Sequence, residues 1–349
     1  MKAISLFSGM GGDSVAIKKC GIDLVAYSEI EKIFQETHDK NFENCELLGN
    51  GDIINTEDDV FLKYNNVVDL IFASPPCQGF SNAGKKNIND PRNTLFREFL
   101  RATKLIKPNY IVGENVKGLL NKKTTKGEYY INVIVNEFEN IGYDVKFKVM
   151  KAHLYGVPQK RERLIIVGVK KTLNKTFEFP EEGENNTHLK DIVSFDMTGA
   201  IKIEKKDFDM TTIPNECILT DMDNEEDTNN PHPNLKLLAK DKNFEYSGVI
   251  HKTRLSFGKR ASPVHGEIVD IRNPCKTIIC TYGRQPRFFV PLKNKNGYYL
   301  RCFTPHELKQ IQGFPSDYEL CGNNTKQITQ IGNAVPPPLI EKVIKELIN

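Results

Sequence analysis

In the first 170 residues, short apolar runs alternate with stretches that have the periodicity of an amphipathic helix. In Thr94–Ile106, for example, apolar side chains recur at helical spacing until Pro108 ends the pattern. The apolar runs are Ala3–Phe7, Leu24–Tyr27, Leu70–Ala73, Tyr110–Val112, Val145–Met150 and Leu164–Val169. This alternation predicts an α/β fold, a doubly wound mixed sheet with helices on both faces.

The pattern changes after about Thr176. The stretch from there to Asn230 is polar and acidic, and only two short possible strands follow, at Thr277–Cys280 and Phe288–Pro291. Near the end, Pro338 is well placed to begin a helix with one apolar stripe. We therefore expect a first domain at 1–175, a smaller irregular domain at 176–300, and a return to the first domain with a C-terminal helix at 301–349.

Charge is unevenly distributed along the chain. The net charge is only +3, but His251–Arg301 contains eleven Lys and Arg against two acidic residues. Such a stretch is typical of a surface that follows phosphates, and a solvated charged loop is the alternative interpretation. The eight cysteines form no CxxC pair and no zinc-like cluster with histidine, so we expect no metal. No run of 18 apolar residues predicts a membrane span.

The segment Ser5–Gly12 carries a strand into a glycine-rich turn. Gly9, Gly11 and Gly12 let a ligand approach the backbone closely, and Glu29 ends the next apolar run, where an acid can hold ribose hydroxyls. The spacing GxGG differs from the dinucleotide pattern GxGxxG. NAD, FAD and S-adenosylmethionine all remain compatible with this segment alone.

The segment Ile71–Ser81 places a cysteine where a buried strand ends. Pro75 and Pro76 fix the backbone just before Cys77, at the edge where open α/β sheets bind ligands. A thiolate is a natural nucleophile for the electron-poor C6 of a pyrimidine. The alternative for an isolated cysteine is a thiol packed in the core.

Two further segments carry charged residues at strand ends. Glu114 ends a strand in Tyr110–Leu120, and its carboxyl group can hydrogen-bond N3 and the amine of cytosine, or simply begin a helix. Arg161 and Arg163 alternate before an apolar strand, so we expect both on one face, where they suit a phosphate or a pyrimidine carbonyl oxygen.

Together these segments resemble the DNA (cytosine-5)-methyltransferase family of restriction–modification type, in the family's order and over about two-thirds of the chain. The resemblance implies the S-adenosylmethionine-dependent, Rossmann-like methyltransferase architecture. Phe7 in the Gly9, Gly11 and Gly12 loop would pack on adenine, and Glu29 would hold the ribose. Asp52 and Ile53 match the turn that meets the adenine amine. The remaining cofactor positions that the resemblance implies are Pro76, Leu95 and Asn333.

The catalytic motifs also match. Cys77 falls on the Pro-Cys nucleophile, Glu114-Asn115-Val116 on the Glu-Asn-Val motif, and Arg161 and Arg163 on Gln-x-Arg-x-Arg. Segments 301–318 and 331–335 match the last two motifs, and the irregular 176–300 region takes the place of the target-recognition domain. Met10, Asp13 and His306 depart from the pattern. The expected DNA-binding residues are Ser81, Lys85, Arg254, Lys259, Arg260, Thr277, Ile278, Arg284 and Arg287.

The resemblance implies that the protein extrudes a cytosine from double-stranded DNA and that Cys77 adds to its C6. The methyl group would come from S-adenosylmethionine, leaving S-adenosylhomocysteine, without a metal. It also implies a cytoplasmic monomer in a bacterial, phage or viral host, and a cognate restriction endonuclease acting on the same site without a stable complex.

Three alternatives remain at this point. RNA cytosine-5 methyltransferases of similar fold read Pro-Pro-Cys-Gln-Pro-Phe-Thr, where this chain reads Pro-Pro-Cys-Gln-Gly-Phe-Ser. A catalytically silent DNA-binding homologue would be expected to lose Cys77, Glu114 or an arginine, and all are present. An NAD-dependent oxidoreductase would leave Cys77 and the late motifs unexplained.

Overall fold

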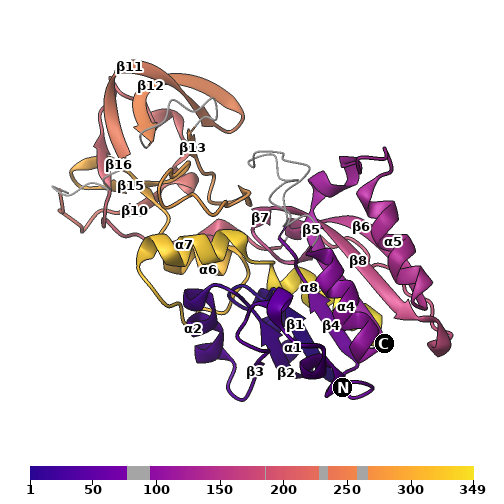
Figure 1. Cartoon of the computed structure of the whole chain (residues 1–349). Helices are drawn as coiled ribbons and strands as arrows, with labels where there is room; N and C mark the ends of the chain where they lie inside the picture. Colours follow the sequence, from indigo (N-terminus) through magenta and orange to yellow (C-terminus); the bar gives the residue numbers. More distant parts are fainter. Residues whose placement is uncertain (77–94, 185, 228–234, 258–265) are drawn as a thin grey trace.

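The protein has two lobes, each built on a seven-stranded sheet (Figure 1). The computed structural model describes residues 1–76, 95–184, 186–227, 235–257 and 266–349, and for 235–244 and 253–257 it describes the backbone alone.

The first lobe contains a mixed sheet of strand order β3-β2-β1-β4-β5-β8-β6. Its strands β1 to β5 run parallel, whereas β8 is antiparallel to both of its neighbours. Each of the six apolar runs falls on one of these strands. Their bounds are β1 Lys2–Leu6, β2 Asp23–Ser28, β3 Glu46–Leu47, β4 Leu70–Ala73, β5 Tyr110–Val116, β6 Tyr143–Lys151 and β8 Glu162–Lys170.

Helices cover both faces of this sheet, so the predicted α/β fold is confirmed. One face packs against α3 (Asp58–Leu62), α4 (Phe96–Ile106) and α5 (Tyr130–Asn140). The other face packs against α1 (Gly12–Lys19) and α8 (Pro337–Ile348). The predicted apolar stripe of the last helix is the side of α8 buried against α1 and the sheet.

The second lobe is a β-sheet, which corrects the expectation of an irregular domain. The strand order is β12-β11-β13-β15-β16-β9, with β10 also paired to β15. The bounds are β9 Ile201–Ile203, β10 Leu219–Asp221, β11 Leu235–Tyr246, β12 Val249–Phe257, β13 Gly266–Ile268, β15 Phe288–Asn294 and β16 Gly297–Cys302. Strand β16 also extends two residues past the expected boundary at 300.

The long hairpin of β11 and β12 escaped the sequence prediction because lysines and acids interrupt its apolar alternation. Its turn did leave a signal. Ser247 and Gly248 both have positive φ, 48° and 80°, between the paired residues Tyr246 and Val249. That is the two-residue hairpin turn that favours glycine.

Thr277–Cys280, predicted as a strand, is not one. The strand in this region is β14 (Cys275–Lys276), which lies just before it and pairs in parallel with β7 (Gln159–Lys160). This two-stranded sheet joins a segment of the second lobe to the edge of the first.

A shared core joins the lobes. It contains Met10 and Val15 of the first lobe, Val290 and Leu292 of β15, and side chains of α6 (Pro305–Ile311) and α7 (Asn324–Asn333). These two helices lie between the lobes in Figure 1, and α2 (Lys32–Asn41) lies below them.

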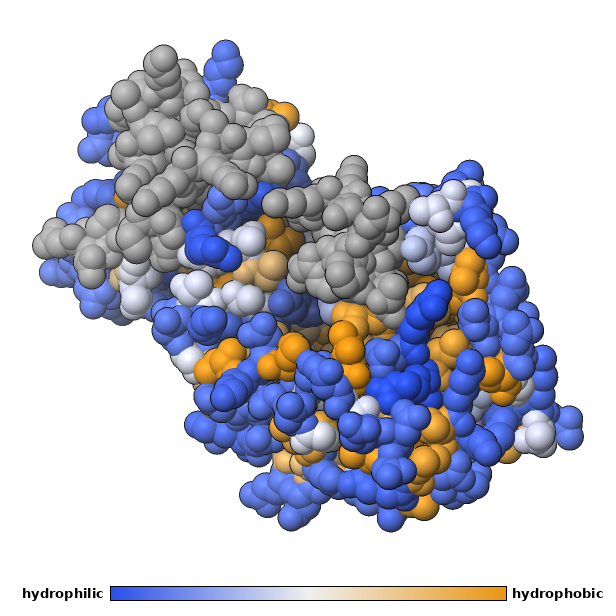
Figure 2. All heavy atoms as spheres, in the orientation of Figure 1, coloured by the Kyte–Doolittle hydropathy of each residue, from blue (hydrophilic) through white to orange (hydrophobic). Residues whose placement is uncertain are grey.

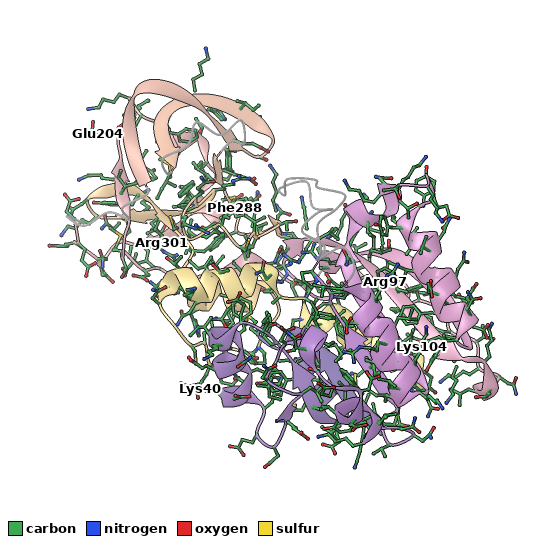
Figure 3. All side chains as sticks on the ribbon, viewed as in Figure 1. Lys40, Arg97, Lys104, Glu204, Phe288 and Arg301 are labelled. Carbon is green, nitrogen blue, oxygen red and sulfur yellow. The ribbon has the colours of Figure 1, made fainter. Side chains whose placement is uncertain are left out.

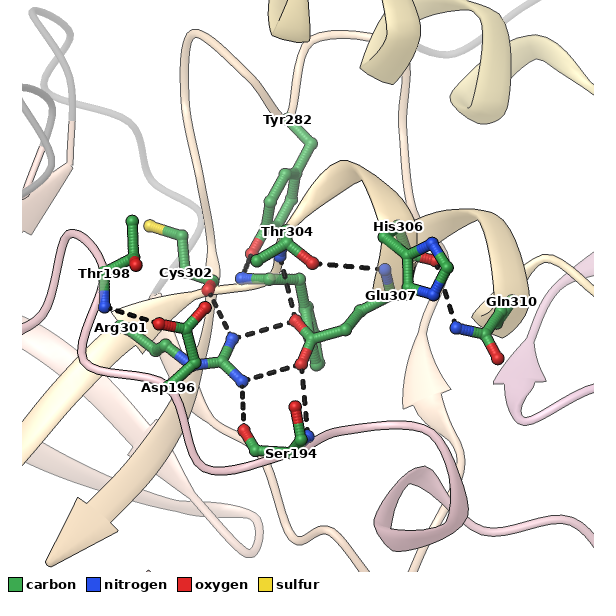
Figure 4. Close-up of polar contacts among 11 residues, drawn as sticks. Ser194, Asp196, Thr198, Tyr282, Arg301, Cys302, Thr304, His306, Glu307 and Gln310 are labelled. Carbon is green, nitrogen blue, oxygen red and sulfur yellow. Dashed lines mark hydrogen bonds and ion pairs between the residues drawn. The ribbon is translucent and has the colours of Figure 1, made fainter. Parts of the chain in front are cut away.

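Arg301 anchors the end of β16 at this junction (Figure 3). Its fully buried guanidinium meets Glu307 through two bonds of 2.6 and 2.8 Å and also donates to the carbonyl oxygens of Ser194 and Cys302 (Figure 4). Arg301 belongs to the basic stretch of the sequence, but its charge is paired with Glu307 inside the protein. Removing one partner of such a pair strongly destabilises the folded protein, because it leaves the other charge buried and unpaired.

Asp13 is a buried carboxyl group in the first turn of α1. Neither of its oxygens has a hydrogen-bond partner among the described residues. Burial raises the pKa of the Asp13 carboxyl to about 7. The folded protein therefore favours the protonated form of this group.

We predict that Asp13→Asn changes how stability depends on pH. A carboxyl whose pKa is higher in the folded state than its unfolded value of 3.8 stabilises the fold most at low pH. That contribution is lost as the pH rises towards 7. As the pH rises across this window, the free energy of unfolding of the asparagine variant should therefore increase relative to that of the wild type, by up to about 1.4 kcal/mol per pH unit. Urea unfolding at several pH values measures the difference, with exposed Asp59→Asn in α3 as the matched control. A pH-independent difference would contradict the prediction.

Candidate active site

Four segments that carry predicted site residues meet at one edge of the first sheet. The glycine-rich loop follows β1, Glu29 follows β2, the Ser74–Pro76 turn follows β4, and Glu114 lies near the end of β5. Because these strands are parallel and β1 lies between β2 and β4, the edge is the switch point where open α/β sheets bind ligands. Cys77 follows Pro76 directly but lies outside the described residues.

The loop after β1 is folded tightly against its surroundings. Phe7 and Gly11 have positive φ, 57° and 87°. A Cβ added at Gly12 would lie 2.3 Å from the carbonyl oxygen of Val335, so a side chain there would displace the backbone before α8. Glycine is thus required at Gly12 by close packing, and this packing joins the loop to the α7–α8 turn.

Glu29 holds this loop from the neighbouring strand. Its carboxylate accepts the N–H of Gly9 at 2.8 Å and that of Glu31 at 2.9 Å. Burial raises the pKa of Glu29, and the two N–H groups act in the opposite direction. A Cβ added at Gly9 would meet no atom of the described residues within 4 Å, so none of them fills the space beside this acid.

Apolar side chains lie next to the same edge. Ile30, directly after Glu29, is 64% exposed, and Ile54 is 61% exposed. A carboxylate for hydroxyl groups, an open loop and exposed apolar side chains fit a nucleoside such as that of S-adenosylmethionine. Sequence reasoning missed Ile30 and Ile54, although a large apolar residue directly after a strand-ending acid was a usable signal.

The turn containing Asp52 is pressed against Glu29. A Cβ added at Gly51 would lie 2.3 Å from the carbonyl oxygen of Glu29. The Asp52 carboxylate accepts the N–H of Ile54 at 3.1 Å and the side-chain amide of Asn55 at 2.7 Å. Ile53 is buried. The structure therefore places the segment beside Glu29, with Asp52 already accepting two local hydrogen bonds.

The turn that leads to Cys77 is tied to both neighbouring strands. The hydroxyl of Ser74 donates to the carbonyl oxygen of Phe7 at 2.9 Å, and the Asn115 amide donates to that of Pro75 at 3.2 Å. Pro76 is exposed, and Leu95, where the described chain resumes, is half-buried at the start of α4. Ser74 and Pro75, which come shortly before Cys77, are thus held between the glycine-rich loop and the strand of Glu114.

Glu114 forms an ion pair with Arg163, with 2.6 Å between Oε1 and Nε, in largely buried surroundings. Burial raises the pKa of Glu114, although Arg163 and Arg161 lower it. Burial likewise lowers the pKa of both arginines. Glu114 therefore binds a proton more readily than usual, and it lies beside two guanidinium groups. A carboxyl group of this kind can donate a hydrogen bond to a ring nitrogen.

Arg161 takes a different position from Arg163. Its guanidinium is buried and donates at 3.0 Å to the carbonyl oxygens of Ile278, Gly332 and Ala334. Among the described residues it donates to backbone carbonyl groups, so it is placed to position the segments that carry them, and a direct role towards a ligand stays a prediction. Ile278 is also fully buried, and its role towards DNA stays a prediction.

Other predicted residues remain accessible. Thr277 is half-buried and donates to the carbonyl oxygen of Lys160 at 3.0 Å. Asn333 is the last residue of α7 and is exposed. Arg284 is exposed, and Arg287 is half-buried, with its pKa lowered by burial.

The basic stretch is less available for phosphates than its charge count suggests. Four of its eleven cations, Arg272, Lys276, Lys295 and Arg301, form ion pairs. The face drawn in Figure 2 is hollowed where the lobes meet, and hydrophobic side chains of the first lobe lie along its edge. The predicted DNA-binding residues Ser81, Lys85, Lys259 and Arg260, and the side chain of Arg254, lie outside the described residues.

Within the described ranges, no three His, Cys, Asp or Glu residues gather as a metal site. The helices in those ranges also include none long and apolar enough to cross a membrane.

Comparison with known proteins identifies the family of the chain. The family described as C-5 cytosine-specific DNA methylase matches residues 1–349. The type II methyltransferase M1.HphI of Haemophilus parahaemolyticus is 33% identical over 99% of this chain and 86% of its own length. M.FnuDI of Fusobacterium nucleatum is 31% identical over 99% of this chain and 94% of its own.

The fold agrees with a solved structure. The DNMT2 of Spodoptera frugiperda superimposes with a TM-score of 0.67 at 21% identity, covering 100% of this chain and 99% of that one. At this identity the likeness concerns the fold, while the match along the whole sequence carries the assignment. The chain belongs to the C-5 cytosine-specific DNA methylase family, as its motifs indicated, and is a methyltransferase of restriction–modification type.

Proposed function

We propose that this methylase transfers a methyl group to C5 of a flipped-out cytosine in double-stranded DNA, with Cys77 as nucleophile and S-adenosylmethionine as donor. The largely buried Glu114–Arg163 pair carries the proposal. It lies at the end of β5, and the adjacent Asn115 holds the turn that ends at Cys77.

The chemistry follows from the residues at this edge. The Cys77 thiolate forms a bond to C6, and protonated Glu114 donates to N3, where electron density would otherwise build up. Its raised pKa supports this role. Arg163 keeps Glu114 in place and faces the ring carbonyl oxygen. The electron pair that leaves the C5–C6 double bond makes C5 nucleophilic.

S-Adenosylmethionine, when bound, supplies the methyl group that C5 takes. Loss of the C5 proton to water then restores the C5–C6 double bond and expels the Cys77 thiolate, and N3 returns its proton to Glu114. A base inside the duplex is closed to attack at C5 and C6, so the cytosine must first leave the stack. The second lobe, with Thr277, Arg284 and Arg287 among its exposed or half-buried polar residues, would hold the DNA.

The proposed cofactor site lies along the edge where β1, β2, β4 and β5 end. Glu29 would accept hydrogen bonds from the ribose hydroxyls, and Phe7 and Ile30 would enclose the purine. Asn333 would approach the methionyl group. Asp52 would meet the adenine amine beside them. In a restriction–modification setting, a separate endonuclease acting on the same DNA site is the expected partner.

The first test uses DNA with fluorine at C5 of the target cytosine. Bisulfite sequencing of DNA from cells that express the protein identifies the site. After methyl transfer, C5 must release its original substituent, and fluorine does not leave as a cation. Cys77 should therefore remain bonded to C6 in a complex that requires S-adenosylmethionine and survives denaturing electrophoresis.

Two variants control this test. Cys77→Ala should form no adduct, whereas Glu114→Gln should form it much more slowly because an amide is a far weaker acid than a carboxyl group and does not transfer a proton to N3. An enzyme that methylates ordinary DNA at full speed yet forms no adduct would contradict the covalent mechanism.

We predict that Glu29 recognises the ribose hydroxyls specifically. The wild type should bind S-adenosylhomocysteine roughly ten- to a hundred-fold more tightly than its 2′,3′-dideoxy analogue, the effect of a charged hydrogen bond worth about 1.5–3 kcal/mol. Glu29→Ala should bind both weakly and nearly equally. Calorimetry measures the four affinities. If the variant still discriminates between the two ligands as the wild type does, Glu29 does not hold the ribose.

A further inference from the structure

Five buried groups form a closed ring of hydrogen bonds beneath the site. The N–H of Ile278 donates to Gln159 Oε1 at 3.0 Å, and Gln159 Nε2 donates to Gln312 Oε1 at 2.6 Å. Gln312 Nε2 donates to the carbonyl oxygen of Ala334 at 2.5 Å. Arg161 closes the ring, because it donates to that same carbonyl and to the carbonyl oxygen of Ile278, each at 3.0 Å.

The ring is buried and closely packed. Gln159, Gln312 and Ile278 are fully buried, and Arg161 is nearly so. At its side, a Cβ added to Gly332 would lie 2.3 Å from the backbone nitrogen of Cys280. The two backbone segments therefore touch directly. A buried polar group that loses its partner is costly, so these segments shift together more readily than apart.

The members of the ring border different parts of the site. Ile278 directly follows Thr277, on the side expected to hold DNA. Ala334 directly follows Asn333, on the side expected to hold the cofactor. Arg161 lies two residues before Arg163, the partner of Glu114. The Arg161 guanidinium thus connects the residue next to Thr277 with the residue next to Asn333, and Arg161 itself lies two residues from the partner of Glu114.

We propose that this ring couples the binding of DNA to the binding of S-adenosylmethionine, with Arg161 as its positioning residue. When bound DNA fixes the positions of Thr277 and Ile278, the ring also fixes the position of the segment Gly332–Ala334. Coupling of this kind is reciprocal, so the cofactor must tighten DNA binding by the same factor. The inference rests on the proposed function, since it assumes that both ligands bind at this edge.

The test measures a coupling factor, the ratio of the dissociation constants of S-adenosylhomocysteine without and with a duplex carrying the target site. The wild type should show a factor of about five or more. In Arg161→Lys the charge remains, but a single ammonium group cannot reproduce the fork that spans three carbonyl groups. Its factor should fall below about two, and DNA affinity should lose its dependence on the cofactor in parallel.

The matched control is Arg301→Lys, the same change at another buried arginine that donates to backbone carbonyl groups outside the ring. It should keep the wild-type factor even if the fold is less stable. Gln312→Met, which removes two bonds of the ring and keeps the side-chain length, provides a second variant should Arg161→Lys fail to fold.

Several results would overturn the inference. They are a wild-type factor of one, a wild-type factor retained by Arg161→Lys or by Gln312→Met, and an equal loss in Arg301→Lys. Failure of the proposed function looks different, because the wild type would then neither methylate DNA nor form the fluorocytosine adduct.

Discussion

The arrangement of the two lobes depends on how Cys275–Cys280 is held against the first lobe. Residues Cys275 and Lys276 pair with β7, and Thr277 donates to Lys160. The next residue, Ile278, has both backbone polar groups bonded to side chains from the first lobe. Because so short a stretch satisfies its backbone on the other lobe, it serves as a fixed edge from which the second sheet extends.

This attachment also explains why charge is buried so close to the site. Arg161 and Arg163 stand with Glu114 in surroundings that lower the pKa of each arginine and raise that of the acid. Burying ions stabilises a fold poorly unless each finds partners. Arg163 finds Glu114, and Arg161 finds backbone carbonyl groups. The cost is consistent with a role in function, where perturbed ionisation is useful.

Prediction from sequence succeeded where one physical pattern acts locally. The buried strands β1, β4 and β5 are continuous apolar runs, and α4 and α8 show helical spacing, so their positions followed from periodicity. The shape of the glycine-rich loop also follows from local chemistry, since few residues tolerate positive φ. The hairpin of β11 and β12 was missed because its strands carry many charges, which interrupt the apolar alternation.

The sequence by itself determined the α/β sheet, the order of the motifs and the family, because these depend on residue type and spacing. Only the tertiary structure decided what each side chain touches. Arg161 and Arg163 stand two residues apart, yet one donates to three backbone carbonyl groups and the other pairs with Glu114. Their partners come from residues between 114 and 334, and no local pattern specifies which distant carbonyl or carboxyl group will lie within 3 Å of a guanidinium. That choice is made when the two sheets and the last helices pack together.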